Sequence, residues 1–271
     1  MLQVGSSAGG ARAKALIAWN DSTNEIRSGQ LSLENGFDYW LIKFDNVSRN
    51  GDHGLEDIPE YTLIEYAYYK MASEAGIDMN ECRIYSHEGE NHFITKRFDR
   101  VNGKKIHMQS LGALAHISYK EPGLCSYEMA SQYMNELNLS MKEIEQFYKR
   151  MVFNVVAVNQ DDHVKNVSFI MDRNGKWKLS PAYDITFSYN PTNKWLRAHQ
   201  MTINQKNTGI NLADLLEAGK KMGLKKSKCM EIISHISSVV DDFEKYAEDA
   251  NIREKTYKEI KNVINQNKLN L

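Results

Sequence analysis

The spacing of apolar residues divides the chain into a β-rich first third and a helical remainder. The runs ALIAW (15–19) and DYWLIKF (38–44) are rich in aromatic and branched residues, which predicts two strands. Residues 60–76 then carry apolar side chains at helical spacing up to Gly76, which predicts a helix. Two more runs, RIYSH (83–87) and NHFITKRF (91–98), predict strands that meet near Glu88 and Gly89.

Beyond this point a turn and then helices are predicted. Asn102 and Gly103 within RFDRVNGKKIHMQ are typical of a hairpin turn. Ser140 followed three residues later by Glu143 is a capping box that opens an amphipathic helix. Further helical patterns cover residues 211–222, 227–249 and 253–266. The chain is therefore expected to be α+β, with a β-rich lobe over residues 1–98 and a helical lobe over residues 99–271.

Composition excludes some classes of protein. The 34 basic residues almost balance the 35 acidic ones, so no overall charge favours nucleic acid or an anionic membrane. No apolar run approaches the ~18–20 residues that a membrane span needs. The 3 cysteines are far apart and odd in number, which is unlike a disulfide framework or a zinc site. A cytoplasmic protein that does not contact membranes is expected.

Candidate chemistry is concentrated in NQDDHVKNVS (159–168). This segment follows a buried helix that is expected to end at Asn159, and the strands VSFIM and KWKLS after it form a hairpin. A hairpin brings its ends together, so Asn166 before it and Asp184 after it should be neighbours. Both offer oxygen ligands suited to Mg²⁺ on a phosphate. Asp161 precedes Asn166 by the spacing of a kinase catalytic loop. The alternative is a solvated turn.

Two upstream features favour phosphate chemistry. GSSAGGARAK (5–14) is a small-residue loop before a strand, and glycines let backbone N–H groups approach phosphate closely. It lacks the ending of a Walker A loop. Lys43 lies in an otherwise apolar strand, which suggests an anionic partner, although an outward-facing lysine would give the same pattern. The order of glycine-rich loop, strand lysine, helix with Glu65, acidic loop and metal ligand is the order that phosphoryl transfer by a kinase requires.

These segments resemble the HipA family of bacterial toxin-type serine/threonine kinases, which have a diverged two-lobed protein-kinase fold. SSAGGARAKAL resembles the phosphate loop of that family, WLIKFD its lysine strand, and EYAYYKMASEAGI its helix with a leading glutamate. RFDR resembles the lobe connection, QDDHVKNVSF the catalytic loop and LSPAYD the metal-binding segment. Family members usually carry a further N-terminal subdomain, and this chain starts almost at the loop, so it resembles a split or truncated member.

The resemblance implies ATP and Mg²⁺ as cofactors and gives roles to the site residues. Asp161 would orient the substrate hydroxyl or accept its proton, and Lys43 would hold the α- and β-phosphates. His163 is a third catalytic candidate, although it could instead brace the loop or a phosphate. Asp162 would support the loop without contacting the substrate or the nucleotide itself. The implied metal ligands are Asn166 and Asp184.

Nucleotide contacts are implied for the glycine-rich loop and for the lobe connection. Ser7 falls where HipA-type kinases autophosphorylate, and a phosphate there would repel ATP; alternatively it is an ordinary loop residue. The full set of candidate cofactor-binding residues is Ser7, Gly9, Gly10, Ala11, Lys43, Phe98, Asp99 and Tyr183.

The predicted function is therefore an ATP- and Mg²⁺-dependent serine/threonine protein kinase. The resemblance implies a protein substrate such as an aminoacyl-tRNA synthetase, a helix-turn-helix antitoxin partner, and contact with DNA only indirectly. Two alternatives stay open. One is a metal-dependent phosphohydrolase that uses Asp161, Asp162 and His163, and the other is a non-catalytic nucleotide-binding or repressor module.

Overall fold

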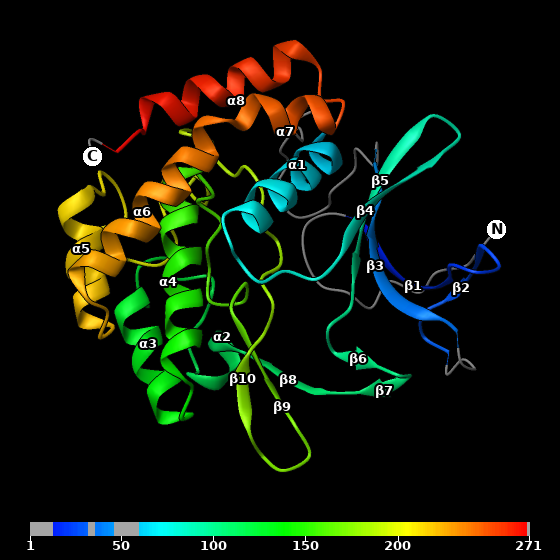
Figure 1. Ribbon diagram of the computed structural model, residues 1–271, viewed down its shortest axis with the longest axis horizontal. Coiled ribbons are helices and arrows are strands. Elements are labelled where there is room, and N and C mark those ends of the chain that lie inside the picture. Colours follow the sequence, from blue (N-terminus) through cyan, green and yellow to red (C-terminus); the bar gives the residue numbers. More distant parts are fainter. Residues whose placement is uncertain (1–12, 32–35, 46–59, 270–271) are drawn as a thin grey trace.

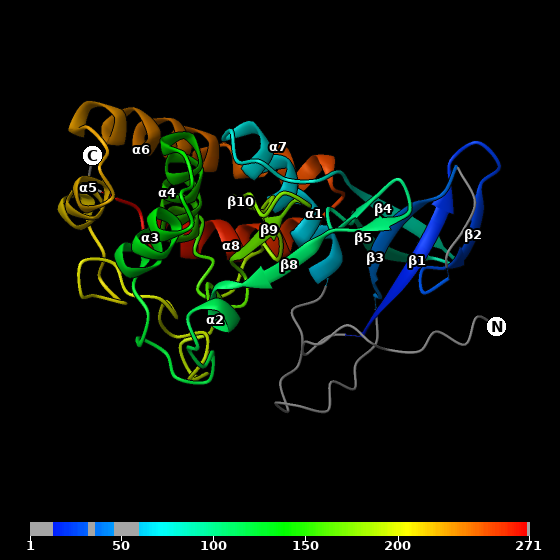
Figure 2. The same ribbon diagram turned by 90° about the horizontal axis from the view of Figure 1, so that it is seen from below.

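The computed structural model describes residues 13–31, 36–45 and 60–269, which form two lobes (Figure 1). A twisted antiparallel sheet makes up one lobe, and most of the helices make up the other. Figure 2 shows the same division from a second side, with the helix α1 between the sheet and the helical lobe. The predicted α+β, two-lobed architecture is confirmed, while the lobe boundary at residue 98 stays a prediction.

The N-terminal sheet contains the four strands expected from the sequence and one more. Its spatial order is β2-β1-β3-β5-β4, and all neighbours are antiparallel. Alternation along the strands buries one face around Ile17, Trp40, Ile42 and Ile94. The strands are β1 (Lys14–Asn20), β2 (Glu25–Ser28), β3 (Asp38–Lys43), β4 (Cys82–His87) and β5 (Glu90–Lys96).

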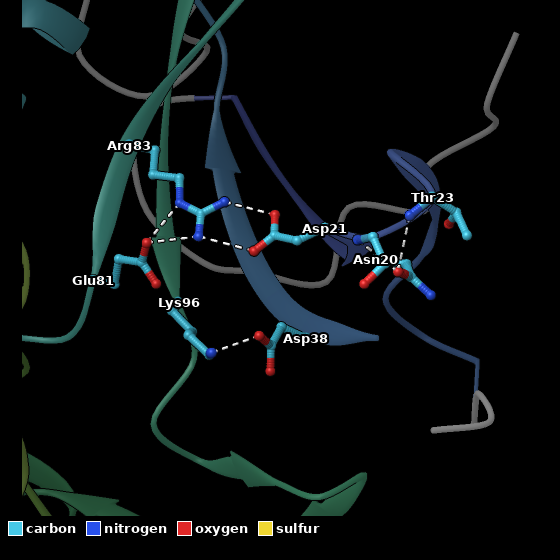
Figure 3. A network of polar contacts seen from close by, with 8 residues as sticks. Asn20, Asp21, Thr23, Asp38, Glu81, Arg83 and Lys96 are labelled. Carbon is cyan, nitrogen blue, oxygen red and sulfur yellow. Dashed lines mark hydrogen bonds and ion pairs between the residues drawn. The ribbon is translucent and has the colours of Figure 1, made fainter. Parts of the chain in front are cut away.

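Arg83 ties the edge strand β4 to the far side of this sheet (Figure 3). Its guanidinium donates to both carboxylate oxygens of Asp21, at 2.7 and 3.0 Å, and to Glu81 at 2.6 Å. The same group lies 5.4 Å from the ring centre of Trp19 and 4.8 Å from that of Trp40. One arginine therefore links the β1–β2 turn, β4 and the aromatic centre of the sheet.

Helix α1 (Tyr61–Glu74) joins the two lobes. It packs on β4 and β5 on one side and on α6 and α7 on the other. Tyr68 on this helix is fully buried, and its hydroxyl donates to the carbonyl of Ala157 at 2.6 Å. This contact fixes α1 against the segment that leads into the loop around Asp161, so the sheet and the loop are held in one arrangement.

The helical lobe is built around α4, whose buried face includes Phe147, Met151 and Phe153. The capping box predicted at its start is present, because the Ser140 amide donates to the Glu143 carboxylate at 2.8 Å. The helices of this lobe are α2 (Leu111–Leu114), α3 (Tyr127–Glu136), α4 (Met141–Val156), α5 (Leu212–Lys221), α6 (Lys226–Asp241), α7 (Phe243–Asp249) and α8 (Glu254–Gln266).

The single helix predicted over residues 227–249 is wrong. The structure has two helices there, with a break at Asp242, whose ψ of 20° departs from helical geometry. The break turns Phe243 into the core, where its ring centre lies 5.8 Å from that of Tyr68. Burial of this aromatic ring of α7 against α1 offsets the lost helical hydrogen bonds.

The acidic loop (residues 159–168) leads directly into a second sheet. Strands β8 (His107–Ser110), β9 (Ser168–Met171) and β10 (Trp177–Leu179) pair in the order β10-β9-β8. The predicted hairpin of VSFIM and KWKLS is confirmed. The other predicted turn, at Asn102 and Gly103, is also present, but it joins only β6 (Arg100–Val101) to β7 (Lys104–Lys105). Residues 107–110 pair with β9 instead.

Candidate active site between the lobes

Three charged side chains meet where the sheet, α1 and the β9–β10 hairpin converge. Lys43 Nζ, at the end of β3, donates to Glu65 Oε1 on α1 at 2.6 Å and forms an ion pair with Asp184 Oδ1. Lys43 is 5% exposed and Glu65 2%. Buried charges are costly unless they are paired, and this geometry pairs them. The lysine thus has the anionic partners that its apolar strand suggested.

Each charge in this triad stabilises the others. Burial alone would lower the pKa of Lys43, but the Asp184 and Glu65 carboxylates outweigh burial and hold it above its ordinary value. Burial would raise the pKa of Asp184, but Lys43, with a smaller contribution from Lys14, holds it well below its ordinary value. Asp184 and Lys43 are therefore both charged at neutral pH.

The acidic loop closes on itself beside this triad. Asn166 Nδ2 donates to the backbone carbonyl of Asp161 at 2.8 Å, and the Asn166 amide donates to the carbonyl of His163 at 2.8 Å. Because the side-chain nitrogen of Asn166 makes this hydrogen bond, its Oδ1 is the atom that can serve as a ligand of a cation. The Asp161 side chain is 44% exposed, and its Oδ1 lies 3.8 Å from His163 Nε2. The loop thus presents a carboxylate to solvent at a fixed position.

Tyr183 ties the loop to the segment that carries Asp184. Its hydroxyl donates to the carbonyl of Lys165 at 2.6 Å and lies 2.5 Å from Ser168 Oγ. Asp184 itself has a φ of 52°, in the left-handed region. The hairpin and these bonds hold Lys165 and Ser168 next to Tyr183, the residue before Asp184. That Asn166 and Asp184 are neighbours and hold a metal ion together stays a prediction.

Asp162 points away from Asp161 into the helical lobe. Its carboxylate accepts from the Tyr127 hydroxyl at 2.8 Å and from the Gln200 amide at 2.7 Å, and His199 Nδ1 lies 2.9 Å away. Asn154 Nδ2 donates to the Tyr127 hydroxyl at 3.0 Å. Asp162 thus connects the acidic loop to the segment that contains His199 and Gln200.

Sequence analysis missed His199 and Tyr127 in this cluster. Each lies more than thirty residues from Asp162 in the chain, at separations of 37 and 35 residues. No spacing motif connects them. A buried histidine can be identified as a partner of the loop only once the path of the chain over residues 190–210 is known.

The lobe connection contains an arginine–aspartate cluster. Asp99 accepts from Arg97 at 2.8 and 2.6 Å and from Arg100 at 2.7 Å. These guanidinium groups hold the pKa of Asp99 below its ordinary value, although burial by itself would raise it. The ring of Phe98 faces that of Tyr183, with centres 5.8 Å apart. Contacts of Phe98, Asp99 and Tyr183 with a nucleotide stay predictions.

The candidate phosphate loop, with Ser7, Gly9, Gly10 and Ala11, lies outside the described residues. Within the described part of the chain, no group of three or more histidine, cysteine or acidic side chains is arranged to hold a metal ion. The oxygens of Asn166 and Asp184 fit a Mg²⁺ ion of the kind that phosphate and water also ligate, since Mg²⁺ commonly takes one or two protein ligands.

The chain is similar in sequence to known proteins. Residues 6–243 match the model of the HipA-like C-terminal domain. A Haemophilus influenzae protein named "Putative kinase" is 30% identical over 52% of this chain and 46% of its own length. "Putative kinase Y4dM" of Sinorhizobium fredii is 26% identical over 60% of this chain and 41% of its own length. This chain therefore spans less than half the length of these relatives.

A solved structure supports the fold. HipA of the Shewanella oneidensis toxin–antitoxin system, solved as a complex with HipB and operator DNA, aligns with 98% of this chain and 64% of its own, with a TM-score of 0.69 and 16% identity. That similarity establishes a diverged two-lobed, kinase-like fold. Within the described residues no helix is long and apolar enough to cross a membrane.

Proposed function

This chain belongs to the HipA-like C-terminal domain family, and we propose that it is an ATP- and Mg²⁺-dependent kinase that phosphorylates a serine or threonine hydroxyl of a protein. The observation that carries the proposal is the ion pairing of the buried Lys43 with the buried Glu65 and the partly exposed Asp184, together with the exposed carboxylate of Asp161. Kinase chemistry needs a positioned lysine, a cation-binding acid and an acid near the substrate hydroxyl, and this site supplies all three.

The contacts of each side chain indicate its separate role in the proposed reaction. Lys43 donates hydrogen bonds to phosphate oxygens, and Glu65 keeps its ammonium oriented through the 2.6 Å contact. With Lys43 bonded to phosphate, the Asp184 carboxylate would be the acid that holds the cation. Asn166 Oδ1 is the second protein oxygen, fixed because the amide nitrogen is bonded to the carbonyl of Asp161. Bound Mg²⁺ neutralises charge on the phosphate oxygens.

Asp161 orients the attacking hydroxyl and receives its proton. The carboxylate is exposed, so a protein substrate can reach it, while the backbone of Asp161 is held by Asn166. An ionised acid within hydrogen-bond reach of the hydroxyl suffices for this role. Asp162 makes no such contact, because Tyr127, His199 and Gln200 surround it.

Substrate and partners follow by resemblance and are part of the proposal. An aminoacyl-tRNA synthetase and a helix-turn-helix antitoxin are the candidates, and DNA would be contacted through the antitoxin. The structural neighbour from Shewanella oneidensis supports such an assembly, since it was solved as a complex with HipB and operator DNA. Autophosphorylation at Ser7 belongs to the same proposal.

One incubation separates the proposed function from its alternatives. The purified chain is incubated with ATP and Mg²⁺, and intact-mass spectrometry then measures phosphate on the protein while a phosphate assay measures free phosphate. A kinase gives labelled protein, a phosphohydrolase gives free phosphate only, and a binding module gives neither. Asp249→Asn, an exposed acid at the end of α7, is the matched control for substitutions of the site aspartates. Free phosphate without protein phosphorylation, with or without added substrate protein, would overturn the proposal.

A further inference from the structure

A cavity of about 600 Å³ lies in the helical lobe, and Gln160 of the acidic loop is one of its lining residues. Its wall comes from the end of α4, the segment 189–213 and the chain after α8. Figures 1 and 2 both place the end of the described chain after α8 beside α5. Segments far apart in sequence therefore border this space, which is partly open to solvent. Cavities of roughly 300–1,000 Å³ accommodate small organic ligands.

The wall of this cavity combines an apolar surface with positive charge. Apolar side chains line much of it: Val155, Val158, Ile210, Leu212 and Leu269. Its two charged lining residues, Arg197 and Lys268, are both cationic, and no acidic side chain is among the described residues that line it. Lys268 is paired with Asp241 at 2.7 Å. Arg197 is exposed and has no ion pair with another described residue, so its charge is available to a ligand.

Two further features favour an anion with hydrogen-bonding groups. The first turn of α5 lines the cavity through Leu212 and Ala213. The capping box of Asn211 and Asp214 uses the backbone N–H groups of these two residues, and the Asp214 carboxylate offsets the partial positive charge of the helix end. The N–H groups of Leu212 and Ala213 are the donors that this turn offers to a ligand. Gln160 also lines it and is only 8% exposed, yet its Oε1 has no hydrogen-bond partner among the described residues. A buried amide oxygen normally accepts a hydrogen bond, and a donor group on a ligand in the cavity would provide it.

The cavity is in direct contact with the loop that carries Asp161. Gln160 is the adjacent residue in the chain. His199, which lines the cavity, is bonded through Nδ1 to the Asp162 carboxylate at 2.9 Å. The next residue, Gln200, donates its amide to the same carboxylate at 2.7 Å. A ligand that orders Arg197 and His199 therefore also orders the groups that anchor the loop.

We propose that this cavity binds a small organic anion with an apolar body, and that its occupancy stabilises the acidic loop through His199 and Asp162. The anionic group contacts Arg197 and the backbone N–H groups of Leu212 and Ala213, while the apolar body lies against Val155, Ile210 and Leu269. The site is separate from the Lys43–Asp184 triad. Binding can be measured without any assumption about phosphoryl transfer, so its failure would leave the proposed function untouched.

The binding experiment uses the fluorescent anion anilinonaphthalene sulfonate as the probe on the full chain. Arg197→Ala should weaken its binding by about tenfold or more, because a charge-assisted hydrogen bond is lost. Arg173→Ala, in the exposed turn between β9 and β10, is the matched control and should bind as the wild type does. Ala213→Trp, at an exposed position on the cavity wall, should block binding. Saturating ATP with Mg²⁺ should not displace the probe.

Other results would overturn the site. Equal affinity of the Arg197→Ala and Arg173→Ala proteins would mean that the probe binds elsewhere, as would displacement by ATP. Arg197 is exposed, so its substitution leaves the fold intact and the comparison stays valid.

Hydrogen exchange tests the connection to the loop. Saturation with the probe should slow exchange of the Gln200 amide, which donates to Asp162, by about threefold or more. Arg197→Ala protein at the same probe concentration should show less protection. Unchanged exchange at Gln200 in the saturated wild-type protein would overturn transmission to the loop.

Discussion

Lys43 Nζ is ion-paired with Asp184 across 141 residues of sequence. The pair joins the sheet of one lobe to the hairpin segment of the other, and Glu65 completes it from α1. In the free protein the lysine thus occupies the position next to the carboxylate that a cation would take. Lys43 keeps Asp184 ionised, as the proposed binding of a cation by this carboxylate would require.

Asp184→Asn should abolish Mg²⁺-dependent phosphorylation while the protein stays folded. Asparagine tolerates the left-handed backbone that Asp184 has, with its φ of 52°, so little strain is expected. Loss of the cation-binding carboxylate should lower turnover by at least about a hundredfold. Steady-state assays alongside thermal melting test this, with Asp249→Asn as the control. Undiminished turnover in a folded variant would remove Asp184 from the metal site.

Lys43→Ala should destabilise the protein as well as impair nucleotide binding. Glu65 is 2% exposed, so removal of the lysine leaves a buried carboxylate without its cation. Breaking one side of a buried ion pair costs about 3–5 kcal/mol of unfolding free energy. The double variant Lys43→Met/Glu65→Leu should recover much of that loss. Urea denaturation measures both, and equal stability of the wild-type and Lys43→Ala proteins would contradict the pairing.

The triad also predicts the pH dependence of stability. The pKa of Asp184 is depressed in the folded state, so its contribution is present above the unfolded-state pKa of about 3.9 and is lost as the pH falls below that value. The pKa of Lys43 is raised, so its contribution is complete below about pH 10 and is lost only at more alkaline pH. Urea midpoints from pH 3 to 9 should show an acid loss that is smaller in Asp184→Asn. An identical acid profile in both proteins would count against this assignment.

Asp162→Ala should impair folding stability more than an exposed aspartate does. Three groups, from Tyr127, His199 and Gln200, would lose their acceptor inside the helical lobe. Unsatisfied buried groups cost about 1–3 kcal/mol each, so a loss of at least about 3 kcal/mol is expected. Calorimetric melting of Asp162→Ala beside Asp249→Ala tests this. A melting temperature equal to that of the control would show that the cluster contributes little.

Arg83→Ala should destabilise the N-terminal sheet without altering the catalytic loop. The variant loses the bidentate contact with Asp21, which Figure 3 draws, and the packing over Trp19 and Trp40. A partly exposed cation over aromatic rings is worth about 1–2 kcal/mol. Arg83→Lys should recover only part of it, because lysine lacks the planar guanidinium. Tryptophan fluorescence during denaturation reports on this lobe, and a change below about 0.5 kcal/mol would contradict the expectation.

The local part of this site could be predicted from the sequence. Asp161, Asn166 and Asp184 lie around one helix end and one hairpin, whose turn residues and apolar runs are adjacent in the chain. Local signals of this kind determine where the ends of a hairpin lie. The predicted hairpin is present for that reason, while the neighbourhood of Asn166 and Asp184 stays a prediction.

The long-range part could not be predicted in the same way. Residues 107–110 pair with β9 about sixty residues later in the chain. No local sequence pattern in either strand indicates which strand it pairs with. The helix break at Asp242 depends on the burial of Phe243 against Tyr68, which is a tertiary contact. The bond between His199 and Asp162 has the same origin. In each case packing between distant segments overrides or supplements a local preference.

The contact that Asp161 makes determines the last prediction. If its carboxylate positions the substrate hydroxyl, Asp161→Gln should keep ATP affinity, because the side chain contacts the substrate and not the nucleotide. Phosphoryl transfer should fall by about a hundredfold or more, since positioned acid–base groups contribute ~10²–10⁴-fold. The substitution leaves the bond from Asn166 to the backbone carbonyl of Asp161 intact, so the metal ligand stays oriented. Calorimetric binding of ATP with Mg²⁺ is measured beside phosphate incorporation by mass spectrometry, with Asp249→Asn as the control. A phosphohydrolase that uses Asp161 as a metal ligand would lose the metal as well as activity, and a non-catalytic module would change in neither measurement. Retained binding with lost phosphorylation supports the kinase, whereas loss of both would remove the hydroxyl-positioning role from Asp161.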